Sequence, residues 1–271
     1  MDAPRQTLIC MAEQQQLLLI ADISGYTSFM RLHAMSLAHA QDIVNDLIDG
    51  LIDASGSPFR LCKIEGDAAF LHAVVAPDDD LSWLLSSVER MKEAFHSIRG
   101  QVAVGTVCVC GACRQVDDLR IKFVAHIGPV HVHQHRGVKD LGGFSVIVVH
   151  RLLKVPVPAD EYLLATEPVL ECLPSSLVVR RLEVDLQDAG RVPVGYATLV
   201  RRSSNSAAPL PAIQRWKISL KRTWRTLPGI LGLKKPCEGF RNIPSAGRES
   251  DAVLVQIDLG RSGGMLPSEV G

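Results

Sequence analysis

The sequence predicts an α/β (α+β) fold, in which helices pack on a sheet of mixed or antiparallel strands. In segments 36–54 and about 81–95, apolar residues recur three and four positions apart, so each segment forms a helix with one apolar face. Two short apolar runs, 59–64 and 68–75, are joined by the tight turn Glu65-Gly66-Asp67, which predicts a β-hairpin. Because helices alternate with hairpins along the chain, a layered arrangement follows.

The remaining elements follow from the same patterns. The first strand is expected at 16–22 and ends at "SGYTS", where Gly25 allows a tight turn before the next helix. Further along, we expect strands at 119–127, 129–134, 161–165, 178–185 and 194–200, and a helix at 145–154 that stops before Pro156.

Domain boundaries are predicted from changes in composition. A domain at 14–200 follows an N-terminal tail at 1–13. Beyond it, "RRSSNSAAPLP" has the composition of a linker, at 201–211. A basic amphipathic segment is expected at 212–248, and the Gly- and Ser-rich residues 249–271 are expected to be disordered.

Composition and charge narrow the function classes. The chain has 271 residues, 47% of them hydrophobic, which is ample for a packed core. Its 29 basic residues balance 29 acidic ones, so no overall field favours nucleic acid, and we expect no nucleic-acid partner. The N-terminal residues lack a long apolar run, and no stretch is apolar enough to span a membrane. We therefore expect a cytoplasmic protein.

Two aspartates raise the question of a metal site. The predicted first strand, "LLIADIS", leads from apolar residues directly into Asp22, where a charge is costly unless something binds it. Asp67 lies in the turn of the predicted hairpin. If those strands are neighbours in the sheet, the two carboxylates meet at one edge and can hold hard divalent ions through their oxygens.

The order and context of these motifs resemble a known family. "ADISGYTSF", then "KIEGDAAF", then "HIGPV" resemble the catalytic domain of class III nucleotidyl cyclases over about residues 14–200. The resemblance implies a ferredoxin-like fold and a homodimer whose sites are completed across the interface. It further implies two divalent metals per site, Mg²⁺ or Mn²⁺. Asp22 and Asp67 match the metal-binding aspartates, and Ile23 matches the residue whose carbonyl also contacts metal.

The resemblance also assigns the substrate-binding residues. Lys63 and Asp140 match the pair that recognises the base, and a Lys/Asp pair implies ATP in preference to GTP. Arg151 matches the arginine that stabilises charge developing on the α-phosphate. The backbone amides of the turn around Gly25, Tyr26 and Thr27 are expected to face the triphosphate.

One position departs from the family. The asparagine that positions the ribose falls on Ile147, whose side chain forms no hydrogen bond. The pattern resembles a divergent bacterial offshoot of the superfamily whose function is unknown. Two functions therefore stay open: a cyclase that converts ATP to 3′,5′-cyclic AMP and pyrophosphate, or a weak or inactive nucleotide-binding or signalling module. Another phosphoryl-transfer or hydrolytic reaction at the same metal pair is a third, weaker reading.

Three clustered cysteines allow two interpretations. Cys108, Cys110 and Cys113 form one Cys-x-x-Cys motif plus a third thiol, which approaches a structural Zn²⁺ site but lacks a visible fourth ligand. Ordinary reduced thiols or a redox-sensitive loop are the alternatives.

The chain beyond the domain is strongly basic. Between Arg201 and Lys235 there are nine Lys or Arg residues and no acid. A helix at 212–227 would place two tryptophans and three aliphatic residues in one stripe. The segment 212–235 is thus expected to lie on an anionic surface of the inner membrane, to dock in an acidic groove of a protein partner, or to pack on its own domain.

Overall fold

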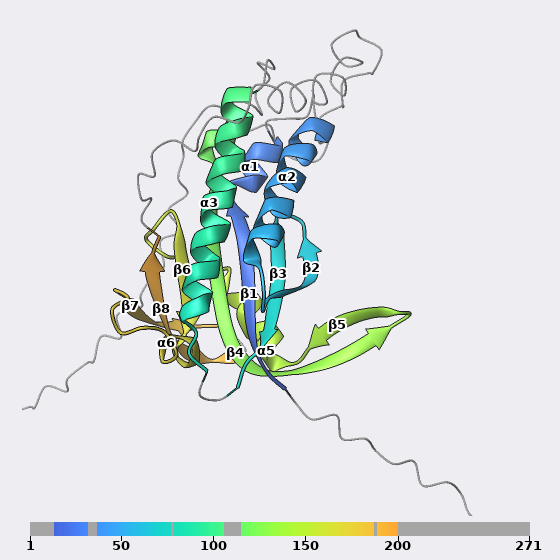
Figure 1. The fold of residues 1–271 in the computed structure, drawn as a ribbon. Helices are drawn as coiled ribbons and strands as arrows, with labels where there is room; N and C mark the ends of the chain where they lie inside the picture. The colour runs from blue at the N-terminus through green and yellow to red at the C-terminus, as the bar shows by residue number, and fades with distance from the viewer. Residues whose placement is uncertain (1–13, 32–36, 77–78, 106–114, 187–188, 200–271) are drawn as a thin grey trace, which may run out of the picture. The chain divides into compact units, whose positions relative to one another are not determined.

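The fold is seen in a computed structural model, which describes residues 14–31, 37–76, 79–105, 115–186 and 189–199. Within these residues the strands form one eight-stranded sheet of order β2-β3-β1-β4-β6-β8-β7, with β5 paired to β4 (Figure 1). The strands are β1 (Gln14–Ser24), β2 (Arg60–Glu65), β3 (Ala68–Val74), β4 (Arg120–His135), β5 (Val138–Gly142), β6 (Tyr162–Thr166), β7 (Arg180–Asp185) and β8 (Arg191–Thr198). The β4–β6 pair is parallel, and the other pairs are antiparallel.

The central strand β1 lies between β3 and β4 and is buried on both faces. Its residues Leu17 to Ala21 are fully buried, which explains why the sequence is continuously apolar there and does not alternate. β1 is antiparallel to both neighbours, so its carboxyl end lies beside the beginnings of β3 and β4.

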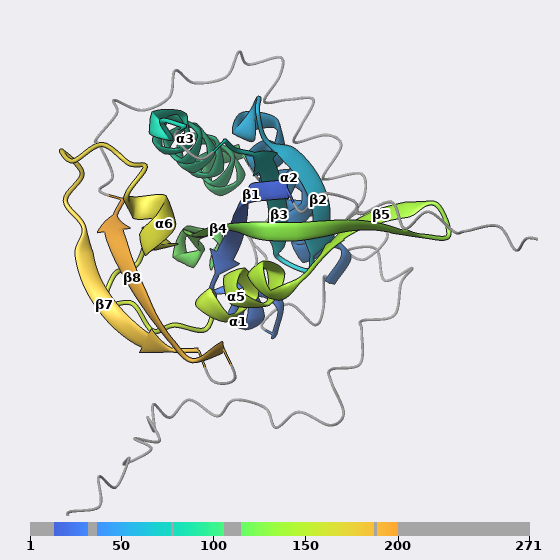
Figure 2. The same ribbon diagram turned by 90° about the horizontal axis from the view of Figure 1, so that it is seen from below.

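Helices cover both faces of the sheet (Figure 2). On one face, α2 and α3 pack their apolar sides against β1 residues such as Leu17 and Leu19. On the other face, α5 packs Val148, Val149 and Leu152 against Leu18, Ile20 and the residues of β6 and β8. The helices are α1 (Tyr26–Arg31), α2 (Leu37–Ser55), α3 (Ser82–Gly105), the short 3₁₀ turn η1 (Val116–Asp118), α5 (Phe144–Leu152) and α6 (Glu167–Leu170).

The predicted mixed sheet with helices packed on it is confirmed, with one error in its strands. Strands expected at 119–127 and 129–134 are a single strand, β4, which continues beyond the sheet as a hairpin with β5 (Figure 1). Gly128 and Pro129 suggested a break, but β4 pairs with β6 only from Lys122 to Ala125, so Pro129 has a neighbour on one side only and its missing N–H is tolerated there. β5 and α6 were not predicted.

The predicted segments beyond the domain lie outside the described residues. These are the linker at 201–211, the basic segment at 212–248 with its amphipathic helix, and the tail at 249–271, together with the N-terminal tail at 1–13. Among the helices that the structure describes, none is both long and apolar enough to cross a membrane.

The central position of β1 leads to a stability prediction. Leu19 on β1 is fully buried against the α2 and α3 helices, so Leu19→Ala leaves a cavity in the core. We expect the free energy of unfolding to fall by about 2–5 kcal/mol, measured by urea denaturation. Val178→Ala is the control, because that side chain is 83% exposed and its loss should cost less than about 0.5 kcal/mol. Equal effects of the two substitutions would contradict this packing.

Candidate functional site

Asp22 and Asp67 come together because β1 and β3 are neighbours. Asp22 pairs in register with Ala68, the first residue of β3. The β2–β3 turn is closed by Gly66, whose positive φ of 66° favours glycine, and it places Asp67 immediately before that strand. The backbone N–H of Ile23 donates to the carbonyl of Asp67 at 3.2 Å, which fixes the turn against the end of β1.

The electrostatics of this carboxylate pair favour a cation. Burial, and secondly the negative charge of Asp22, raise the pKa of Asp67 from 3.8 to about 6. A divalent cation would stabilise the ionised form of Asp67 beside this second carboxylate. Nearby, burial and the charge of Asp67 also raise the pKa of Tyr26, at the start of α1.

A lysine that the sequence analysis missed forms an ion pair with Asp22. Lys122 on β4 is directly opposite Asp22, and its Nζ lies 3.0 Å from Asp22 Oδ2. The same Nζ donates to the carbonyl of Leu153 at 3.3 Å. Tyr162 on β6 is opposite Lys122 in turn. We call Asp22, Lys122 and Tyr162 the polar row, because they cross three adjacent strands at one level.

Tyr162 shares the electrostatic environment of the polar row. Burial raises the pKa of its hydroxyl, and the nearby charges of Lys122 and Asp22 act on it in opposite directions. The signal that was available for Lys122 is a charged residue inside the otherwise apolar run "IKFVAHI".

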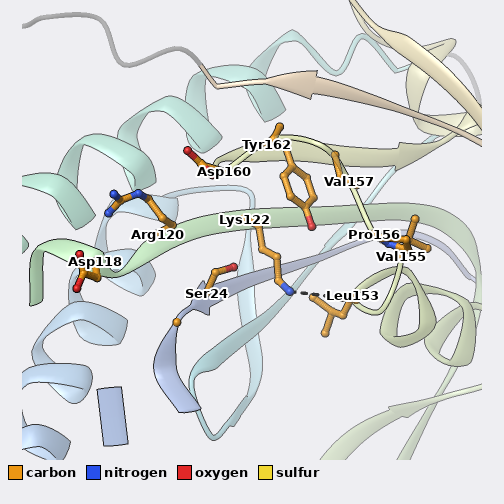
Figure 3. Close-up of a pocket in the computed structure, with 12 residues that line it drawn as sticks. Ser24, Asp118, Arg120, Lys122, Leu153, Val155, Pro156, Val157, Asp160 and Tyr162 are labelled. Atoms are coloured by element: carbon orange, nitrogen blue, oxygen red, sulfur yellow. Dashed lines mark hydrogen bonds between the residues drawn. The ribbon is translucent and has the colours of Figure 1, made fainter. Parts of the chain in front are cut away.

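A cavity of about 370 Å³ opens beside the polar row. Ser24 and Gly25 contribute from the turn after β1, Arg120 and Lys122 from β4, and residues between Leu153 and Tyr162 from the α5–β6 connection. Figure 3 shows Lys122 pointing toward Leu153 at this wall. Of the expected triphosphate-facing residues, Gly25 lines the cavity, while Tyr26 is half-buried and Thr27 exposed at the start of α1.

Lys63 and Asp140 also come together, at the edge of the sheet. Lys63 Nζ lies 3.7 Å from Asp140 Oδ1 and 3.0 Å from Glu65 Oε1. The Leu141 N–H donates to Asp140 at 2.8 Å. This hydrogen bond, with the charge of Lys63, holds the pKa of Asp140 below its usual value. The expected base-recognising pair is therefore in contact, but Lys63 is shared with Glu65.

Glu65 connects this edge to α5. His150 Nε2 lies 2.8 Å from Glu65 Oε2, and His150 Nδ1 lies 2.7 Å from the carbonyl oxygen of Val146. Both ring nitrogens therefore face oxygen atoms, which fixes the orientation of the ring. Burial alone would raise the pKa of Glu65, but Lys63 and His150 together lower it. Sequence reasoning missed this contact, since the two residues are 85 positions apart.

Arg151 and Ile147 lie one turn apart on α5. The Arg151 guanidinium donates from Nη1 to the carbonyl of Leu186, in the connection between β7 and β8. Ile147 is 49% exposed and Phe144, at the start of the helix, is 61% exposed. The structure therefore presents an apolar surface where the resemblance implied a ribose-binding asparagine.

The other predicted metal site cannot be placed. Cys108, Cys110 and Cys113 fall in 106–114, outside the described residues. In the part of the chain that is described, no group of three or more His, Cys, Asp or Glu side chains is arranged to hold a metal ion, so Asp22 and Asp67 would hold one as a pair with the Ile23 carbonyl.

Two sequence comparisons find similar proteins that are described as uncharacterized or of unknown function. A family model described as "Protein of unknown function (DUF2652)" matches residues 44–162. The chain is 36% identical over 215 residues to "Uncharacterized protein Rv2561/Rv2562" of Mycobacterium tuberculosis, covering 77% of this chain and 98% of that protein.

Two solved structures are similar in fold. The guanylyl cyclase Cya2 superposes with a TM-score of 0.54 at 14% identity, over 72% of this chain and 98% of that one. The adenylyl cyclase CyaB from P. aeruginosa gives 0.50 at 14% identity, over 70% and 97%. The predicted class III cyclase fold is thereby confirmed.

The raised pKa of Asp67 predicts a pH dependence of stability. Between pH 3.8 and about 6 the unfolded chain loses this proton while the folded protein retains it, so Asp67 makes the free energy of unfolding fall as pH rises through that window. Asp67→Asn should remove this decline. The free energy of unfolding of the variant should therefore rise, relative to that of wild type, as the pH passes from below the window to above it. Urea denaturation in metal-free buffer across the window measures it, with Asp53→Asn, an exposed carboxylate on α2, as control. Parallel curves for wild type and Asp67→Asn would refute the assignment.

Proposed function

The chain belongs to the family of the M. tuberculosis protein Rv2561/Rv2562 and has the fold of class III nucleotidyl cyclases, and on this premise we propose that it is a divalent-metal-dependent nucleotidyl cyclase. The favoured substrate is ATP, and the products are 3′,5′-cyclic AMP and pyrophosphate. In this reaction the ribose 3′-oxygen forms a bond to the α-phosphorus, the bond from that phosphorus to the bridging oxygen breaks, and pyrophosphate leaves.

The observation that carries the proposal is the carboxylate pair at the end of β1. Mg²⁺ in nucleotide sites is held by one or two carboxylates together with substrate phosphates, so the pair Asp22 and Asp67, with the Ile23 carbonyl, suffices without a third acidic ligand. When bound, divalent metals lower the pKa of the attacking hydroxyl and neutralise charge on the leaving phosphates. The raised pKa of Asp67 supports metal binding, because a nearby cation would stabilise the ionised form of that carboxyl.

The contact between Lys63 and Asp140 supports recognition of a purine. One side chain donates hydrogen bonds and the other accepts them, and both are partly exposed at the sheet edge. An ammonium in this place can donate a hydrogen bond to an acceptor on the adenine edge, and the carboxylate can accept one from a donor on the same edge. We assign them to substrate binding on this basis.

A second copy of the chain would complete the site. Two apolar side chains on α5, the helix that packs on the same face of the sheet as the Lys63 partner Phe70, are exposed and favour burial against a partner: Phe144 and Ile147. In the proposed homodimer, the metal pair of one chain faces Lys63, Asp140 and Arg151 of the other. Arg151 would then exchange its bond to the Leu186 carbonyl for the α-phosphate, a stronger charge-assisted partner.

A specific observation favours the alternative, a weak or inactive nucleotide-binding module. Ile147 leaves the ribose without a hydrogen-bonding partner, and Arg151 is engaged by a backbone carbonyl. Such a protein would bind nucleotide through Lys63 and the metal pair without turning it over. Nucleotide binding without product formation distinguishes this function from a cyclase.

The first test is direct. Purified protein incubated with ATP or GTP and Mn²⁺ or Mg²⁺ should release cyclic nucleotide and equimolar pyrophosphate, with ATP preferred. Asp22→Asn and Asp67→Asn should each lower the rate by at least about 10² because transition-state charge is left unbalanced, while Asp53→Asn should match wild type. Product that survives both aspartate substitutions would point to a contaminant, and metal-dependent ATP binding without product would establish the alternative.

Restoring the missing amide should raise activity. Ile147→Asn places a hydrogen-bond donor and acceptor where the resemblance implies a ribose contact, and a preorganised contact of this kind is worth about 10²–10³ in rate. The comparison is with Ile147→Ala, which removes the apolar side chain and adds no amide. If the asparagine variant is no faster than the alanine variant, Ile147 does not mark the ribose site.

A further inference from the structure

The Lys122 ammonium lies 3.0 Å from Asp22 Oδ2, one of the two oxygens through which Asp22 could bind a divalent metal. We propose that Lys122 is a tethered counter-cation, which neutralises Asp22 in the metal-free protein and which a divalent metal must displace in order to bind. This inference rests on the proposed function, because it concerns the same carboxylate pair. It adds a residue that sets the metal affinity.

Distances show why the two cations compete. Lys122 Nζ lies 3.0 Å from Asp22 Oδ2, and both side chains are more than four-fifths buried. A magnesium ion would have to lie about 2.0–2.1 Å from a carboxylate oxygen of the same residue. Two cations on one small carboxylate repel each other strongly where water is largely excluded. A metal on Asp22 Oδ2 therefore requires the ammonium to move.

The structure provides a place for the displaced ammonium. The second partner of Lys122 is the neutral carbonyl of Leu153, at 3.3 Å, which the side chain can keep or leave at small cost. Lys122 also forms part of the wall of the 370 Å³ cavity, whose lining includes the carboxylates of Asp118 and Asp160 (Figure 3). The ammonium can therefore turn from Asp22 into an open cavity whose wall carries these two carboxylates and the Arg120 guanidinium.

The benefit of such an arrangement lies in the metal-free fold. Asp22 follows fully buried residues on the central strand, and a carboxylate there without a counter-charge would destabilise the sheet. Lys122 supplies that charge from the adjacent strand. The protein can then fold without metal, and the metal binds more weakly than the carboxylates alone would allow.

The test is direct measurement of Mn²⁺ binding to the full chain without nucleotide, by calorimetry or electron paramagnetic resonance. Lys122→Met keeps the apolar stem and removes the charge, so Mn²⁺ should bind about tenfold more tightly, the least effect expected for removing a charge at this distance. Lys122→Arg keeps the charge and should retain the weak affinity. Lys154→Met, an exposed lysine near the same connection, is the matched control and should equal wild type.

The outcomes distinguish competition by Lys122 from the existence of the metal site itself. If wild type binds Mn²⁺ and Asp22→Asn does not, but Lys122→Met binds no more tightly than wild type, Lys122 is not a competitor and the metal site still stands. If Mn²⁺ binding by wild type and by Lys122→Met does not depend on Asp22, so that Asp22→Asn leaves it unchanged or there is none to remove, the metal site and the proposed function are both wrong.

A measurement on unsubstituted protein covers the case in which Lys122→Met does not fold. Amine-reactive footprinting read by mass spectrometry should show that Mn²⁺ increases labelling of Lys122, because the displaced ammonium enters the open cavity. Labelling of Lys154 should stay constant. Unchanged or reduced labelling of Lys122 at saturating Mn²⁺ would overturn the proposal.

Discussion

The rest of the site depends on one constraint, the carboxylate of Asp22 at the end of a strand that is buried on both faces. A charge in that position must be compensated by neighbours, because the sheet excludes water from most of its surroundings. The neighbours are set by strand pairing: Ala68 and the preceding Asp67 on one side, Lys122 on the other, and Tyr162 one strand farther. The Asp22–Asp67 carboxylate pair and the polar row are thus two consequences of the same register.

The β2–β3 hairpin links the two halves of the site. It carries Lys63 in the edge strand and Asp67 in the turn, so a single short segment contributes to both the proposed base-recognising pair and the proposed metal pair. Asp140 reaches Lys63 only because β4 runs on past the sheet and returns as β5. The length of β4 therefore positions Asp140 at the edge of the sheet.

What the sequence predicts well is local or follows from motif order. Apolar spacing predicted a helix at 36–54, found as Leu37–Ser55, and the glycine turn predicted the hairpin whose tip holds Asp67. What it did not predict depends on pairing between distant strands. Lys122 faces Asp22, and Glu65 meets His150, only once the register of the sheet and the position of α5 are fixed. Neither contact has a signature at short sequence separation.

The energies of two interactions indicate which departure from the cyclase pattern has the larger effect on activity. Glu65 competes with Asp140 for Lys63, but these side chains are about one-third exposed, and pairs of that kind contribute only about 0–1 kcal/mol. A nucleotide can displace Glu65 at little cost, so binding is expected to survive. A missing preorganised contact in the transition state costs about 2.7–4 kcal/mol, and Ile147 would impose that loss on the chemical step. The proposed cyclase is therefore expected to bind nucleotide and to turn it over slowly.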